Sequence, residues 1–176
     1  MNKNVRFMTN TAMIAAVYTV MSMVLAPLAF SQIQIRFAEI LCLLPVINSK
    51  NIWGITLGCL LTNLIGAMLG INILGYIDVI IGTFATFVGA YLTFRLRYIK
   101  FFNLPLLSAL MPVIANAVII GAELSFAFMP NEFLLGWLIN GFYVGLGEFI
   151  AVVVIGLFFY NMLENRNLLK IFNNYN

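Results

Sequence analysis

The sequence predicts an all-α integral membrane protein built as a bundle of six transmembrane helices. Of its 176 residues, 63% are hydrophobic and only 9% are charged, and the mean hydropathy is +1.04. Soluble domains have roughly 45–50% apolar and about 25% charged residues. The apolar residues also form long runs, and a membrane-spanning helix needs about 20 of them. Six such helices with short turns use almost the whole chain, which predicts one transmembrane domain over residues 1–176 and no soluble domain.

Apolar runs bounded by Pro, Gly, Asn or charged residues define the individual spans. The six predicted spans are residues 8–29, 34–48, 52–70, 75–94, 104–128 and 134–162. The second is short and opens on a polar stretch that includes Arg36 and Glu39. Polar groups are costly against lipid, so we expect this span to begin in a cavity lined by protein.

Basic residues predict the orientation of the bundle. When the six spans alternate in direction, one side of the membrane collects Lys3, Arg6, Lys50, Arg95, Arg97, Lys100, Arg166 and Lys170, and the other side only Arg36. Because positive charge accumulates on the inner face, both termini are expected in the cytoplasm. The loops at 30–35, 71–74 and 129–133 then face outward.

Small residues repeat every four positions in two of the spans. Such rows let another helix approach closely, within the chain or from a separate membrane protein. In the third span the row is Gly54, Gly58, Thr62, Gly66 and Gly70, which we interpret as helix packing. In the first span, Ala12 and Ala16 share the spacing, and a second row contains Ala15, Thr19 and Ser22.

Four carboxylates, Glu39, Asp78, Glu123 and Glu148, lie at or within apolar runs. A charge there is costly and marks a ligand site, an ion path or a buried pair. The predicted orientation places Glu39, Asp78 and Glu123 in the outer half of the membrane and Glu148 near the middle of the sixth span. Together they predict a solute site inside the bundle.

Other recognition groups share helix faces with two of these acids. Asn116 lies seven residues before Glu123, and Trp137 lies eleven before Glu148, so each pair occupies one face of its helix. Trp137 offers a stacking surface to a flat or cationic ring, or alternatively belongs to the interfacial aromatic belt, and the same applies to Tyr143.

Asn63 and Asn140 are two further candidates for the same site. An asparagine in a membrane helix serves equally well as a hydrogen bond between helices. Arg36 and Glu39, three residues apart, can pair along their helix, which would leave the other acids without a basic partner in the membrane. An acidic cavity of this kind favours a neutral or cationic ligand rich in hydrogen-bond donors.

The chain lacks the residues that metal binding, ATP hydrolysis and nucleic-acid binding require. There is no histidine, and Cys42 and Cys59 form no Cys-x-x-Cys pair, so no metal or cofactor site is predicted and both cysteines are expected to be packed thiols. No phosphate-binding loop of the Gly-x-x-x-x-Gly-Lys-Ser/Thr type occurs, so ATP-driven uptake would need partner subunits. Scattered Lys and Arg form no cluster for nucleic acid. An enzyme is disfavoured.

A set of short motifs in a fixed order resembles the queuosine-precursor transporter family (QueT). These motifs are FSQIQIRFAE at 30–39, LLP at 43–45, Trp53-Gly54-x-x-x-Gly58 with Asn63, DVIIGT at 78–83, Asn116-Ala117 and Gly147-Glu148. Members of this family are S components, the substrate-binding subunits of energy-coupling-factor (ECF) transporters. The resemblance covers nearly the whole chain.

The resemblance implies a bacterial plasma-membrane subunit that captures queuine, queuosine or an aminomethyl-deazaguanine from outside. It would then dock on a shared membrane coupling subunit driven by two ATPase subunits, using Ala12 and Ala16. The first outer loop, about 26–36, would close over the ligand. Glu148 and Glu123 are expected as principal ligand acceptors and Asp78 and Glu39 as secondary ones, since carboxylates suit the donors of a guanine-like edge and an aminomethyl cation. Arg36 is expected to anchor the closing loop through Glu39.

Three other readings remain open at this stage. The same architecture can carry another vitamin-like solute. A stand-alone proton-coupled transporter can use buried carboxylates as a proton relay. A scaffold protein can use Gly and Ala rows for packing alone. The substitution Glu148→Gln separates solute capture, which it should abolish, from a scaffold, which it should leave intact.

Overall fold

The computed structural model describes residues 2–29 and 36–166, and within these ranges the chain is helical without a β-strand. In chain order the elements are α1 (Lys3–Val24), α2 (Ala26–Ala29), the 3₁₀-helix η1 (Phe37–Val46), α3 (Asn51–Met68), α4 (Ile77–Arg95), α5 (Leu106–Phe128), the 3₁₀-turn η2 (Pro130–Glu132), α6 (Phe133–Glu148), the π-helical segment η3 (Phe149–Gly156) and α7 (Leu157–Asn165). The predicted all-α class is confirmed for the described residues.

Five of the described helical stretches are long and apolar enough to cross a membrane. They are α1, α3, α4, α5 and the continuous stretch Pro130–Asn165. The predicted second span, 34–48, is present as the ten-residue helix η1, which at about 2 Å per residue is shorter than the roughly 30 Å hydrocarbon core. The protein is therefore multi-pass, and η1 is an apolar helix that does not span the core alone.

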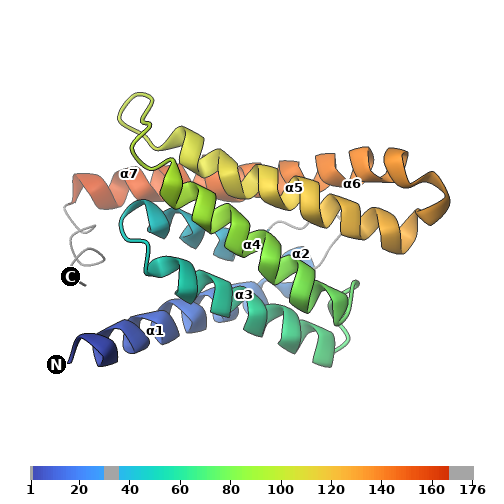
Figure 1. Ribbon diagram of the computed structural model, residues 1–176, viewed down its shortest axis with the longest axis horizontal. Helices are drawn as coiled ribbons and strands as arrows, with labels where there is room; N and C mark the ends of the chain where they lie inside the picture. Colours follow the sequence, from blue (N-terminus) through green and yellow to red (C-terminus); the bar gives the residue numbers. More distant parts are fainter. Residues whose placement is uncertain (1, 30–35, 167–176) are drawn as a thin grey trace.

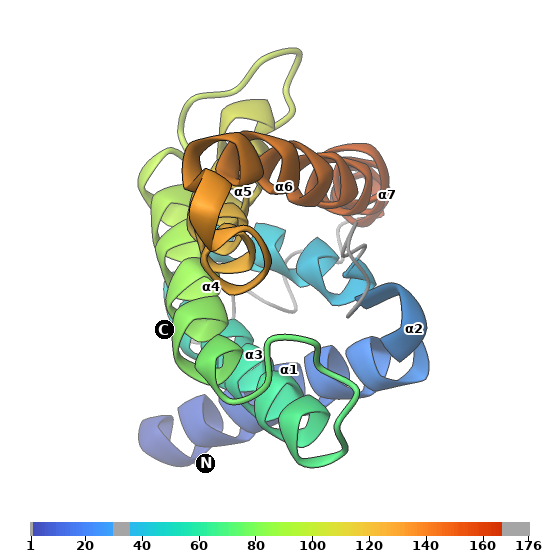
Figure 2. The ribbon, with the colours of Figure 1, turned by 90° about the vertical axis from the view of Figure 1, so that its right-hand side faces the viewer.

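The helices form an open ring around η1. Viewed end-on, α1 and α3 make one side, α5, α6 and α7 make the opposite side, and α4 joins the two along an edge (Figure 2). Neighbours in this ring are in direct contact, while η1 contacts α1, α3, α4, α5 and η3 from inside. Arg36, directly before η1, and Ala38 and Glu39 in its first turn are buried. The expectation that this segment begins among protein groups is confirmed.

With the short helix η1 counted between α1 and α3, successive elements run in alternating directions, so that α1 and α3 are parallel (Figure 1). The first turn of α1, the segment before α3, the α4–α5 loop and the end of α7 share one end of the bundle, whereas the α3–α4 and α5–α6 connections share the other. The described members of the predicted basic side belong to the first group. Lys170 and the predicted outer loop 30–35, with most of the expected closing loop, lie outside the described residues.

The glycine row of α3 packs against α1, as its spacing predicts. A Cβ built on Gly54 would lie 2.8 Å from the Cβ of Ile14, and one on Gly58 would lie 2.7 Å from the Cβ of Tyr18. Both distances are too short for any side chain larger than hydrogen. Thr19 strengthens the contact by donating its hydroxyl to the Gly58 carbonyl at 3.2 Å.

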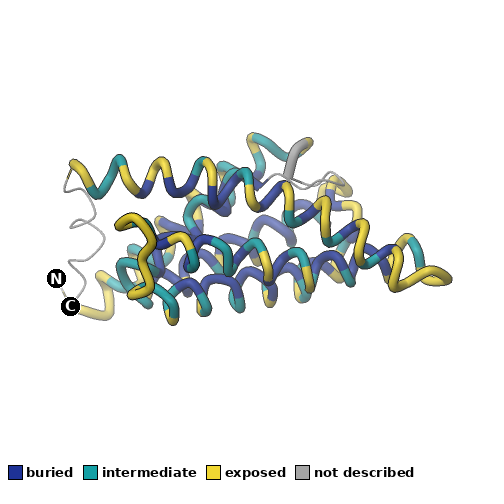
Figure 3. The backbone as a smooth tube through the Cα atoms, turned by 90° about the horizontal axis from the view of Figure 1, so that it is seen from above, coloured by how far each residue is buried: buried dark blue, intermediate teal, exposed yellow. Residues whose placement is uncertain are grey.

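The two small-residue rows of α1 face different ways. Ala15 and Ser22 are buried, so the second row packs within the bundle. Ala12 and Ala16 are exposed. Buried positions elsewhere likewise follow the sides on which the helices meet, and exposed positions follow the loops and outer sides (Figure 3). The exposed sides carry large apolar residues such as Ile80 and Phe126, as a surface facing lipid does.

The predicted sixth span contains a change of helix type. It runs without a break from α6 through the π-helical η3 to α7. The π-helical segment begins directly after Glu148. π-helical turns are rare and are found frequently at functional sites. Periodicity alone predicted one uniform helix here.

Candidate solute-binding site

The interior of the bundle concentrates charge. Among residues 2–29 and 36–166, the buried charged side chains are Arg36, Glu39, Asp78, Glu123 and Glu148. They come from the start of η1 and from α4, α5 and α6. They are close enough to interact electrostatically: Glu123 interacts with Asp78 and Arg36, and Glu148 interacts with Glu39 and Arg36. Four carboxylates thus share one interior with one guanidinium.

Asp78 pairs with Arg36. Nη2 of Arg36 lies 3.2 Å from Oδ2 of Asp78, and both side chains are buried. The pair ties the start of η1 to the first turn of α4. Of the arrangements that the sequence left open for Arg36, pairing with Glu39 along the helix is not the one present, and the prediction that the remaining acids, Asp78 among them, lack a basic partner is wrong for Asp78. The physical reason is that the ring of helices brings α4 beside the polar start of η1, which spacing along one helix cannot reveal.

The α3–α4 loop supplies Asp78 with a second partner. Nδ2 of Asn72 donates to Oδ2 of Asp78 at 2.8 Å, and Oδ1 of Asn72 accepts from the backbone N–H of Leu74 at 3.0 Å. Gly70 and Gly75 bound this loop with φ of +69° and +64°, a backbone region that favours glycine. The glycines let the loop fold back so that Asn72 reaches α4.

Glu39 is held by three side chains. Its Oε1 accepts from the Tyr18 hydroxyl of α1 and from Oγ1 of Thr86 of α4 at 3.4 Å. Its Oε2 accepts from Sγ of Cys42, one turn along η1, at 2.7 Å. Both of its carboxylate oxygens are therefore occupied by groups of the chain. Cys42 is a buried free thiol, as predicted, and so is Cys59.

Asn63 serves as a hydrogen bond between helices. Its Nδ2 donates to the Asp78 carbonyl oxygen at 2.9 Å and so links α3 to α4. Oδ1 of Asn63 has no hydrogen-bond partner among the described residues. Of the two roles that the sequence left open, the structure supports the interhelical bond.

Glu148 lies deep in the bundle beside Asn116. It is 2% exposed, and its hydrogen-bond partner is the Asn116 side chain of α5, which is buried as well. Oε2 of Glu148 has no partner in the described part of the chain, and neither does Nδ2 of the buried Asn140, two turns earlier on α6. An acceptor at Glu148 and, two turns away on the same helix, a donor at Asn140 therefore remain available.

Glu123 is the most open of the four acids. It lines a cavity of about 740 Å³, formed by the α3–α4 loop, the first turns of α4, the last turns of α5 and Phe133 of α6. Every other described lining residue is apolar, and neither Glu123 oxygen has a hydrogen-bond partner within those ranges. The volume lies within the roughly 300–1,000 Å³ typical of small-molecule sites.

Trp137 does not join the carboxylates. Its indole N–H donates to the Val118 carbonyl oxygen at 3.0 Å, and the side chain lines a separate groove between α5 and α6 with Phe142. Its ring also stacks on Phe133, with 6.4 Å between the ring centroids, within the roughly 4.5–7 Å typical of aromatic pairs. Sharing a helix face with Glu148 in the sequence was therefore not sufficient to bring it to the acids.

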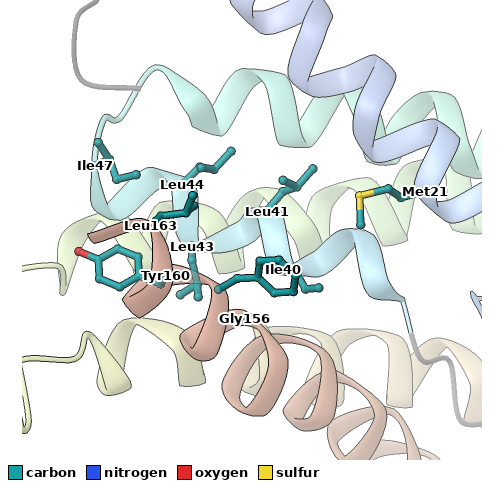
Figure 4. A pocket seen from close by; sticks show the side chains of 10 residues that line it. Met21, Ile40, Leu41, Leu43, Leu44, Ile47, Gly156, Tyr160 and Leu163 are labelled. Carbon is teal, nitrogen blue, oxygen red and sulfur yellow. The ribbon is translucent and has the colours of Figure 1, made fainter. Parts of the chain in front are cut away.

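A further cavity, of about 230 Å³, lies between α1, η1 and α7 (Figure 4). Its walls are side chains such as Met21, Leu41 and Leu44 on one side and Tyr160 and Leu163 on the other. No carboxylate or basic side chain is among the described residues that line it. It therefore lacks the groups that would recognise a polar solute.

Sequence reasoning missed the residues that hold the acids in place. These are Tyr18, Asn72 and Thr86, together with the thiol of Cys42. A tyrosine or threonine in an apolar span and an asparagine in a glycine-bounded loop are common without such a role. Only the contacts across the bundle distinguish them.

A multi-pass helical protein with unpartnered carboxylates in its interior has the architecture of a membrane transporter for a small molecule. The comparison with protein families identifies the QueT transporter family, whose profile matches residues 8–165. The chain belongs to the QueT transporter family. The comparison with curated proteins and the comparison with solved structures each give no match.

Proposed function

We propose that this chain is the substrate-binding S component of an ECF transporter and captures a queuosine precursor or related deazaguanine. Candidate solutes are queuine, queuosine and an aminomethyl-deazaguanine. The observation that carries the proposal is the Glu148–Asn116 pair, deeply buried yet with Oε2 of Glu148 open. A carboxylate held beside an amide complements a guanine-like edge, which presents adjacent N–H donors beside a carbonyl acceptor.

The charge of the interior supports the same ligand class. The pairing of Arg36 with Asp78 offsets one of the four acids, so negative charge remains in excess when the others are ionised. An aminomethyl cation or several N–H donors would offset this excess and relieve the cost of burying unpartnered carboxylates. Anionic solutes are disfavoured for the same reason.

The pattern of contacts divides the predicted ligand set. We propose Glu148 and Glu123 as the principal acceptors, because both have open oxygens and neither forms an ion pair with a described residue. Asp78, although its Oδ1 is open, is paired with Arg36. Asn116 is hydrogen-bonded to Glu148, and Asn140 lies two turns earlier than Glu148 on α6 with an open donor. Asn63 keeps one open oxygen beside Asp78. Glu39 and Asp78 are secondary candidates, since their contacts are made by the chain itself, and Arg36 acts through Asp78.

Uptake would be driven by partner subunits. The chain has no phosphate-binding loop, and the proposed partners are a membrane coupling subunit and two ATPase subunits in the bacterial plasma membrane, with both termini cytoplasmic. The exposed Ala12 and Ala16 of α1 are the proposed docking contact. Replacing both with Phe should weaken co-purification with the coupling subunit, whereas Val154→Phe, on an exposed position of η3, should not.

Calorimetry on the purified chain in detergent tests the proposed solute. We expect saturable binding of at least one of the three deazaguanines, weaker binding of guanine, which shares their edge, and none of riboflavin or thiamine. Glu148→Gln should weaken binding by about tenfold or more, as loss of a charge-assisted hydrogen bond does. Glu132→Gln is the matched control, because Glu132 is exposed in η2. Absence of binding by folded protein would refute the solute assignment.

Transport in vesicles separates this proposal from a proton-coupled transporter. An S component needs its ATPase partners and ATP, and uptake should survive a protonophore while ATP is held constant. Uptake by the chain alone that the protonophore abolishes would contradict the proposal and favour a carboxylate proton relay.

A further inference from the structure

The two proposed principal acceptors, Glu148 and Glu123, lie at different depths along one wall of the bundle. Glu148 is bonded to Asn116 of α5, and Glu123 lies seven residues further along the same helix. Seven residues are close to two turns, so Asn116 and Glu123 share a face and are separated by about 10 Å along the axis. Both are buried. The deep acceptor and the outer acceptor are therefore aligned on α5.

The inner end presents mixed hydrogen-bonding groups. The Asn116 amide has a donor and an acceptor, and Glu148 adds an oxygen that no described residue occupies. Such a set recognises an edge that alternates donors and acceptors. A neutral heterocyclic edge fits these groups without a second full charge.

The outer end presents a carboxylate in apolar surroundings. Glu123 is only 7% exposed, and the cavity that it lines is otherwise formed by Ile, Leu, Ala and Phe side chains among the described residues. No wall residue donates a hydrogen bond to either Glu123 oxygen within residues 2–29 and 36–166. A carboxylate so placed gains most from a ligand cation, because the low-dielectric walls screen the attraction little.

We propose that the solute lies along α5, with its heterocyclic edge at Glu148 and Asn116 and an ammonium group at Glu123, so that Glu123 selects the cationic form. This inference rests on the proposed function and deepens it. In an aminomethyl-deazaguanine, the amine edge of the six-membered ring and the aminomethyl group lie toward opposite ends of the bicycle. One molecule then engages both acceptors.

Two probes with one skeleton test this orientation. The aminomethyl-deazaguanine carries the cation, and the corresponding cyano-deazaguanine is neutral at the same position. Calorimetry should show that the wild-type chain binds the aminomethyl compound about tenfold or more tightly than the cyano compound, the size expected for a charge-assisted contact. Glu123→Gln should bring this ratio of affinities toward one, chiefly by weakening the binding of the aminomethyl compound.

Matched variants locate the effect. Glu148→Gln should weaken the binding of both compounds by similar factors, so the ratio of their affinities should stay close to that of the wild type. Glu132→Gln should behave like the wild type, because Glu132 lies exposed in η2 outside the cavity. Melting temperatures without ligand establish that each variant is folded.

The outcomes distinguish this inference from the proposed function. If folded wild-type protein binds neither compound, the deazaguanine assignment fails and the orientation falls with it. If both compounds bind equally to the wild type, or if Glu123→Gln leaves the ratio unchanged, the orientation is wrong while the proposed function stands. The wild-type ratio is decisive even if the Glu123 variant does not fold.

Discussion

Glu39 and Asp78 differ from Glu123 and Glu148 in their partners, although all four are carboxylates buried in apolar helices. The first two accept hydrogen bonds or an ion pair from Tyr18, Cys42, Thr86, Asn72 and Arg36. Glu123 and Glu148 have oxygens without a hydrogen-bond partner and form no ion pair with a described residue. Oδ1 of Asp78 also lacks a hydrogen-bond partner, but the Asp78 carboxylate is paired with Arg36. The comparison teaches that burial of a charge does not by itself define a ligand site. We infer that the first pair stabilises the bundle and the second pair binds solute.

The largest effect on stability is expected at Asp78. Asp78→Leu removes the partner of the buried Arg36 pair and the acceptor of Asn72, and loss of one member of a buried ion pair costs about 3–5 kcal/mol. The free energy of unfolding, measured by denaturation with sodium dodecyl sulfate in mixed micelles, should fall by that amount. If Asp78→Leu leaves the free energy of unfolding unchanged, Asp78 does not stabilise the bundle.

A double variant sharpens this result. Combining Arg36→Met with Asp78→Leu replaces both charges by apolar groups, which is often neutral or stabilising for buried ion pairs. Most of the lost stability should return. If the double variant is as unstable as the two single losses added together, the interaction between the two residues is not the cause.

A smaller effect is expected at Tyr18. Tyr18→Phe keeps the ring against α3 but removes the hydroxyl that donates to Glu39, and a hydrogen bond to a charged group contributes about 1.5–3 kcal/mol. Unfolding in mixed micelles should detect a loss of this size. Tyr76→Phe, at an exposed position before α4, is the matched control and should be close to neutral. Equal losses in both would show that the hydroxyl contact with Glu39 is unimportant.

The smallest of these losses is expected at Thr86. Its hydroxyl is 3.4 Å from Oε1 of Glu39 and 3.2 Å from Sγ of Cys59, and long or weak contacts of this kind contribute about 0.5–1.5 kcal/mol. Thr86→Val preserves the shape of the side chain. A stability loss larger than that of Tyr18→Phe would reverse the assigned order of contacts around Glu39.

Much of the fold could be predicted because the bilayer imposes it. Apolar runs of sufficient length give the spans, and the predicted 52–70 and 104–128 differ from α3 and α5 by at most two residues at each end. The four buried acids were also identified, since a charge in an apolar run is costly wherever the helix packs. The glycine row predicted close packing, although its partner, α1, emerged only from the structure.

The partners of the acids could not be predicted, because they depend on how the helices are arranged around η1. Arg36 is three residues from Glu39 and 42 from Asp78, yet its ion pair is with Asp78. Trp137 fits the face of Glu148 by periodicity but bonds to Val118 instead. The π-helical segment after Glu148 has no periodic signal that separates it from an ordinary helix.

The most direct test compares Glu148→Gln with Glu39→Gln by melting temperature, with and without saturating aminomethyl-deazaguanine. Glu148→Gln should melt at or above the wild-type temperature, because it removes a buried charge with an open oxygen, and should show a smaller increase with ligand, because it binds the ligand more weakly. Glu39→Gln should melt at a lower temperature and still show an increase with ligand. A lower melting temperature for Glu148→Gln with its ligand response intact would contradict the division between stabilising and solute-binding carboxylates.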